Sequence, residues 1–223
     1  MDNIAIHTKW RPDKTEQQHQ ARHHQHTYQI LDKLEENDLY LKPEKCTFEQ
    51  EEIDYLGVIV GCNTIKMDPS KIKGVADWPV PRNPTEICQF LGFTGYYWYF
   101  IPNYSKITWP LLDLTRKAVN WEWREPQKQA FEELKTWMCA HPVLAQPDFN
   151  KQFYLQTDAS AYGMGAVLSQ EGEATTSQTK THKPKLYPIA YYSATFIPVE
   201  MNYNIYKREL LAMMKPLPTG NTT

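Results

Sequence analysis

Several parts of the chain show apolar side chains spaced three or four residues apart, as is typical of helices. Tyr28, Leu31 and Leu34 recur between charged positions, which predicts a helix over residues 15–36 that ends at Asn37-Asp38. Asn83-Pro84 marks another start, because it supplies a capping side chain and a first-turn proline. Further helices are predicted over residues 70–78, 84–97, 104–116 and 126–140, and from Pro198 onward.

Other parts alternate apolar and polar residues, which predicts strands. In the first part of the chain these are residues 1–8, 39–42, 48–60 and 65–67. After His141-Pro142 they are residues 152–157, 163–169 and 189–193. The polar residues 170–185 predict a long exposed loop. The change of character at His141-Pro142 places a domain boundary near residues 142–150 in a mixed α/β (α+β) chain.

Composition restricts the function classes. A net charge of -2 and a pI near 6.4 give no overall support for nucleic-acid binding, so any such function must rest on local motifs. The four cysteines occur singly, which is typical of reduced thiols rather than a disulfide framework. The sequence shows neither an apolar run of about 18 residues nor a signal peptide. We therefore expect an intracellular protein with no membrane partner.

One carboxylate lies where it could do chemistry. Asp158 is near the end of a predicted strand, with small residues around it. Such a carboxylate can hold a hard cation and leave room for a phosphate. A lone Asp at this position more often caps a turn. The order of elements favours chemistry, because two more strands and a helix carrying Glu209 follow Asp158.

The second half resembles the ribonuclease H domains of retrotransposons in the blocks TDASAYGMGAVLSQ, PIAYYSATFIPVEMNY and YKRELLAMMK. The resemblance implies that Asp158 and Glu209 are two of four carboxylates that bind two Mg²⁺ ions. Such ions lie about 3.5–4 Å apart and clamp the attacking and leaving oxygens of a phosphate. The family's other two Asp residues follow the Glu-bearing helix, whereas this sequence has no acid after Glu209. We therefore expect an incomplete metal site.

The first half resembles the reverse transcriptase of gypsy-class LTR-retrotransposon pol polyproteins. The motifs are MDNIAI, LEENDLYLKPEKCTFEQEEIDYLGVIV, KMDPSKIKGVADWPVP and FLGFTGYYWYFIPNYSKIT. They imply the end of the palm, the primer-grip hairpin and the thumb. Asp2 then matches a metal-binding Asp of the family's Tyr-x-Asp-Asp hairpin, and Asn3 replaces the second Asp.

The resemblance also implies contacts with nucleic acid. Tyr55-Leu56-Gly57 falls at the primer grip, and Cys88, Gly92 and Tyr96 share one helix face. On that face a glycine would let the backbone approach a duplex minor groove, and Tyr96 would rest on sugars. The alternative is a core tyrosine beside a helix-packing glycine. Trp98 stands where the family usually has a basic residue, which should weaken phosphate contact.

Two other clusters have simpler interpretations. His19, His23 and His26 share a helix face, which suggests zinc, but no fourth ligand has matching spacing. An exposed polar helix face is therefore the favoured interpretation. The loop lysines could contact nucleic acid, although lysines in a polar loop are more often only solvated; they are Lys180, Lys183 and Lys185.

The resulting prediction has four parts. Residues 1–79 are the palm end and a primer-grip-like hairpin, and residues 80–141 are thumb and connection helices. Residues 142–216 are an incomplete ribonuclease H-like sheet with one helix, and residues 217–223 are an unrelated tail. The family activities implied are RNA-directed DNA synthesis and endonucleolytic cleavage of RNA–DNA hybrids.

For the chain itself we expect a segment of a retrotransposon reverse transcriptase and ribonuclease H that is inactive alone. Its partners would be an RNA–DNA hybrid or primer–template duplex, bound weakly, and the rest of the pol polyprotein. Its cofactor would be Mg²⁺ at an incomplete site. The alternative is a non-enzymatic nucleic-acid-binding remnant or the product of a degenerate transposable element.

Overall fold

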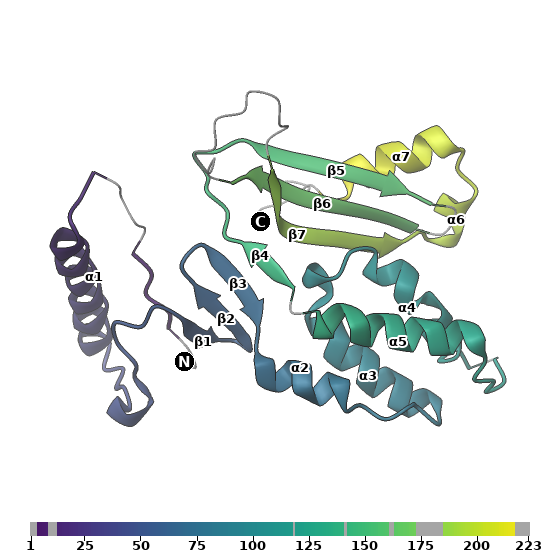
Figure 1. The fold of residues 1–223 in the computed structure, drawn as a ribbon, viewed down its shortest axis with the longest axis horizontal. Coiled ribbons are helices and arrows are strands. Elements are labelled where there is room, and N and C mark those ends of the chain that lie inside the picture. Colours follow the sequence, from purple (N-terminus) through teal and green to yellow (C-terminus); the bar gives the residue numbers. More distant parts are fainter. Residues whose placement is uncertain are drawn as a thin grey trace. The chain divides into compact units, whose positions relative to one another are not determined.

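The computed structural model of the chain describes residues 4–8, 13–117, 119–140, 142–160, 163–172 and 185–216. The chain divides into two units, Met1–Leu56 and Gly57–Thr223, whose elements are labelled in Figure 1. This division does not test the domain boundaries that the sequence predicts after residues 79 and 141, which remain predictions. No helix among the described residues is long and apolar enough to cross a membrane.

The first unit is built on the helix α1 (Glu16–Glu36), as its apolar spacing predicts. Thr15 and Gln18 form a capping box: the Thr15 hydroxyl accepts the Gln18 N–H, and the Gln18 side-chain oxygen accepts the Thr15 N–H. This exchange satisfies N–H groups that have no partner within the helix. The short helix η1 (Pro43–Lys45) and strand β1 (Ile53–Tyr55) follow.

Three strands predicted in the first part of the chain are wrong in whole or in part. Residues 4–8 and 39–42 have no regular secondary structure. Alternation alone does not make a strand, because the backbone N–H and C=O groups also need a partner. The strand predicted over residues 48–60 is reduced to β1 and β2 (Val58–Gly61). Leu56 and Gly57 interrupt it with φ angles of 51° and 76°, which no strand accommodates.

The second unit begins with an antiparallel hairpin of β2 and β3 (Thr64–Met67). The strand β4 (Val143–Ala145), which the sequence did not predict, pairs with β3. Gln146 then anchors this strand, because its side-chain amide donates to the Gly61 carbonyl at 2.9 Å. The residues just after His141-Pro142 therefore belong to the sheet that contains β2 and β3, and not to the sheet formed by the strands that follow.

Four helices and one short helical turn pack around a common core in this unit. They are α2 (Pro69–Ala76), α3 (Pro84–Tyr96), η2 (Trp98–Phe100), α4 (Tyr104–Asp113) and α5 (Glu125–Cys139). The predicted caps are present: the Asp68 carboxylate accepts the Ser70 N–H, and the Asn83 side chain accepts the Glu86 N–H. The rings of Phe90 on α3 and Phe131 on α5 lie 4.6 Å apart in the core.

The second sheet is antiparallel, in the order β5 (Phe153–Ala159), β6 (Gly163–Glu171) and β7 (Leu186–Thr195). The single helix predicted from Pro198 onward is split into α6 (Pro198–Met201) and α7 (Ile205–Met214). The split arises at Asn204, whose side chain accepts the Lys207 N–H and starts a new helix. Most of the predicted loop over residues 170–185 lies outside the described residues.

Candidate nucleic-acid interface and carboxylate site

One face of α3 is open. The three residues that the sequence places on it, Cys88, Gly92 and Tyr96, are all exposed. A Cβ atom built on Gly92 would meet no other atom within 4 Å. The interpretation of Gly92 as a helix-packing glycine and of Tyr96 as a core residue is therefore wrong. The core side of α3 is formed instead by residues such as Ile87 and Phe90.

A hydrogen bond holds Gly57 beside this open face. The Tyr97 hydroxyl donates to the Gly57 carbonyl at 3.0 Å. A Cβ atom on Gly57 would lie 3.8 Å from the Tyr96 ring. The structure thus brings together two of the residues predicted to contact nucleic acid, Gly57 and Tyr96. Tyr55 and Leu56, also predicted, belong to the first unit.

The phenols near this face stay uncharged at neutral pH. Burial, followed by the charge of neighbouring Tyr96, raises the pKa of Tyr99 above its usual value. Burial also raises the pKa of Tyr104, and a hydrogen bond from Thr94 only partly opposes that effect. Tyr99, which interacts with Tyr96, therefore adds no negative charge beside the open face, whereas the Tyr104 hydroxyl lies inside the packing of α3 and α4.

Asp158 lies on the face of the second sheet that faces α4. It pairs with Gly165 of β6, which pairs with Ser193 of β7, and paired residues share one face of a sheet. The Ser193 hydroxyl accepts the N–H of Ser105 on α4 at 3.0 Å. A Cβ atom on Gly165 would lie only 2.3 Å from the side-chain oxygen of Asn103, the residue that precedes α4.

An open pocket of about 190 Å³ lies between this face and the start of α4. Its polar lining includes the Asp158 carboxylate and the side chains of Asn103, Gln156 and Tyr191. Burial raises the pKa of Tyr191, so its phenol can donate a hydrogen bond at neutral pH. Such a lining can accept a cation or a hydrogen-bonding group.

Glu209 lies on the other side of this sheet. Its helix α7 contacts β5 and β6 through a small apolar cluster that includes Ala159, Met164 and Ala212. Since Ala159 follows Asp158 in the strand, the two point to opposite faces. The side chain of Asp158 on the edge strand β5 therefore points to the face of the sheet opposite to the one that α7, with Glu209, covers.

The described side chains, as placed, do not match a two-Mg²⁺ site. Among them, no group of three or more His, Cys, Asp or Glu residues could hold a metal ion. Asp2, the third predicted metal ligand, lies outside the described residues. A site built on Asp158 and Glu209 would need further carboxylates to offset the repulsion between two divalent cations.

Comparison with known proteins decides the family. Residues 123–219 match the family described as the RNase H-like domain found in reverse transcriptase. Over 97% of its length the chain is 36% identical to the Tf2-7 and Tf2-8 transposon polyproteins of Schizosaccharomyces pombe. The chain belongs to the gypsy-class LTR-retrotransposon polyproteins. It spans 15% of the length of these curated relatives.

Solved structures show that this retrotransposon polyprotein chain has a reverse-transcriptase fold. A foamy viral protease-reverse transcriptase in complex with dsDNA has a TM-score of 0.61 and 22% identity, covering 78% of this chain and 34% of its own. The same TM-score and identity apply to a foamy viral protease-reverse transcriptase in complex with an RNA/DNA hybrid, of which 22% is covered. The predicted combination of reverse-transcriptase and ribonuclease H-like elements in a mixed helix and sheet chain is confirmed.

Sequence reasoning missed the wall that Pro102 and Asn103, directly before α4, contribute to the Asp158 pocket. Asn103 adopts a left-handed conformation with φ of 54°, which Asn tolerates better than most residues. An Asn directly before a predicted helix was the available signal. The contact with Gly165 could not be read from the sequence, because it joins residues that are far apart in the chain.

Proposed function

We propose that this segment of the retrotransposon polyprotein binds a nucleic-acid duplex, either a primer–template or an RNA–DNA hybrid, along the open face of α3. The observation that carries the proposal is the space around Gly92, where no atom lies within 4 Å of a built Cβ. A duplex backbone needs such space to approach a helix closely. Tyr96, half exposed one turn later, offers a ring to the sugars.

The surroundings of this face support weak rather than tight binding. Most affinity for a duplex comes from neutralising phosphates with Lys and Arg. The chain carries a net charge of -2, and exposed Trp98 stands where the family usually has a cation. The uncharged phenol of Tyr99 adds no negative charge that would oppose a phosphate backbone. The foamy viral relatives of the same fold were solved with dsDNA and with an RNA/DNA hybrid.

Tyr96→Ala is expected to weaken binding of an RNA–DNA hybrid by about fivefold, which corresponds to about 1 kcal/mol. Loss of the half-exposed ring removes its contact with the sugars. Fluorescence anisotropy of a labelled hybrid at several salt concentrations measures the effect, and affinity should fall as salt rises. Tyr28→Ala is the matched control, because Tyr28 is an exposed tyrosine on α1 in the first unit. Equal losses for the two variants, or binding that ignores salt, would contradict the proposal.

We propose a narrower role for the carboxylates. Asp2 in the palm end, and Asp158 and Glu209 in the ribonuclease H-like part, belong to two separate sites, each of which binds Mg²⁺ only together with further acidic residues supplied by the rest of the polyprotein. This proposal rests on the resemblance and on the position of Asp158 in an open pocket that Asn103 and Gln156 also line. The hybrid-binding samples test it when Mg²⁺ is added: the RNA strand should stay intact. Mg²⁺-dependent cleavage that Asp158→Asn abolishes would show that the carboxylates of the chain already complete the ribonuclease site.

A further inference from the structure

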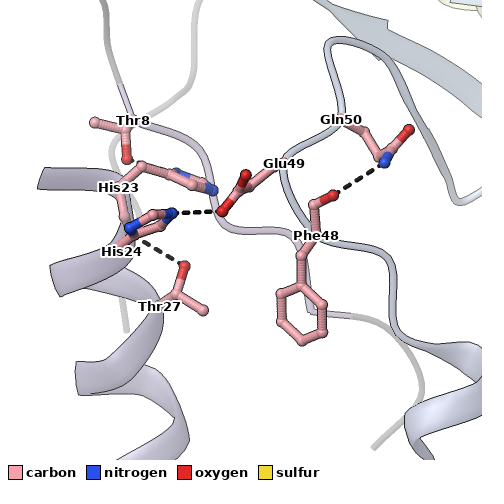
Figure 2. A network of polar contacts seen from close by, with 7 residues as sticks. All are labelled: Thr8, His23, His24, Thr27, Phe48, Glu49 and Gln50. Carbon is pink, nitrogen blue, oxygen red and sulfur yellow. Dashed lines mark hydrogen bonds and ion pairs between the residues drawn. The ribbon is translucent and has the colours of Figure 1, made fainter. Parts of the chain in front are cut away.

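The first unit contains a histidine cluster that duplex binding does not use. The Nδ1 atoms of His23 and His26 lie 2.9 Å and 3.1 Å from the same atom, the Thr8 hydroxyl oxygen. Figure 2 shows Thr8 beside His23 of α1. The two histidines are three residues apart on α1, so their rings project from neighbouring turns of one helix face.

The two hydrogen bonds do not fix which of the two imidazoles carries a proton on Nδ1. A hydroxyl carries one proton, so Thr8 can donate to only one of the two Nδ1 atoms. The other imidazole must then carry its own proton on Nδ1. Two imidazole nitrogens and one hydroxyl oxygen that converge in this way also resemble part of a coordination sphere, because neutral imidazole is the commonest metal ligand in proteins.

We propose that His23, His26 and Thr8 form an open binding site for a divalent transition-metal ion, with Zn²⁺ as the expected ligand. Metal–nitrogen bonds are about 2.0–2.1 Å long, so two ligands of one ion lie about 2.9 Å apart at right angles and about 3.3 Å apart in the tetrahedral geometry that Zn²⁺ prefers, a spacing of about 3 Å. The two nitrogen–oxygen separations, 2.9 Å and 3.1 Å, match that spacing. The rings need only turn so that both Nδ1 lone pairs point at one ion, and water completes the coordination.

Neighbouring histidines do not belong to this site. His24 is turned toward Glu49, and its Nε2 atom is hydrogen-bonded to the Glu49 carboxylate (Figure 2). His19, which is buried on α1, does not come together with His23 and His26 as a three-residue group that could hold a metal ion among the described residues. The site therefore differs from the face of His19, His23 and His26 that the spacing suggests. Two imidazoles and a hydroxyl predict an affinity well below that of a four-ligand structural zinc site.

The test is a Zn²⁺ titration of the full chain followed by NMR of the histidine ring Cε1–H groups, of which there are seven. The signals of His23 and His26 should move together at one equivalent, and those of His24 should not. His23→Ala and His26→Ala should each weaken Zn²⁺ binding at this site at least tenfold. Thr8→Val, which keeps the side-chain shape, should weaken it less. The ring signals also separate this site from any Zn²⁺ held by the cysteines.

His24→Ala is the matched control, because it removes a histidine of the same helix and should leave the shifts of His23 and His26 intact. His23→Gln serves if circular dichroism shows that His23→Ala loses helix. The proposal is overturned if Zn²⁺ moves neither signal, in which case the cluster only holds Thr8. It is equally overturned if Zn²⁺ moves mainly His24, or if folded His23→Gln binds as tightly as the unsubstituted chain.

Discussion

Leu134→Ala is expected to lower the free energy of unfolding of the second unit by about 3 kcal/mol or more. Leu134 is fully buried on α5, in the core cluster that also contains Phe90 and Phe131. Truncation removes apolar contact and leaves a cavity that rigid helices cannot close. Tryptophan fluorescence during urea unfolding measures the change, because six of the seven tryptophans lie within Gly57–Thr223.

Leu112→Ala is the matched control. Leu112 lies on α4 with 42% of its surface exposed, so the same substitution should cost less than about 1 kcal/mol. Similar losses for the two variants would mean that Leu134 is not part of a packed core. A change in the slope of the unfolding curve, rather than in its midpoint, would instead indicate an altered unfolded or native ensemble.

Gly163→Ala is expected to destabilise the second sheet by about 2 kcal/mol. A Cβ atom at Gly163 would lie 2.7 Å from the carbonyl oxygen of Ala194 on the neighbouring strand β7. Because the obstructing atom is backbone, the substitution can be accommodated only if β6 and β7 move apart. The urea midpoint should fall, and amide hydrogens of β7 should exchange faster than those of α5.

Gly92→Ala provides the opposite case. Gly92 lies inside α3 with open space around it, so alanine should stabilise the helix by about 0.5–1 kcal/mol. Destabilisation by both alanines, to the same extent, would show that a general loss at glycine, rather than the contact with Ala194, accounts for the effect at Gly163.

The helices were predictable because their signals are local. Asn83 and Asp68 cap the following helices through their own side chains, and the prolines after them fit the first turn. The apolar spacing in α5 predicts one side with Ala130, Phe131, Leu134, Trp137 and Met138, and the structure buries all of these except the exposed Trp137. Such signals act within one turn of helix, so the sequence alone contains all that is needed.

The strands and the site were less predictable, because they depend on distant partners. β4 has only three residues, and it is a strand because β3 lies beside it. The alternation over residues 39–42 lacks any such neighbouring strand among the described residues. The position of Asp158 followed from a family motif, whereas the Asn103 wall of its pocket depends on packing between segments far apart in sequence.

The most direct test of duplex binding on α3 uses the chain's own cysteines. Cys88 is exposed on the same face as Gly92 and Tyr96, and Cys62 is exposed in the turn between β2 and β3. The rate at which a small thiol reagent alkylates each cysteine, with and without saturating RNA–DNA hybrid, is read by mass spectrometry. We predict that the hybrid slows alkylation of Cys88 at least fivefold and leaves Cys62 unchanged. Unchanged alkylation of Cys88 under conditions where anisotropy shows the hybrid to be bound would contradict binding at this face.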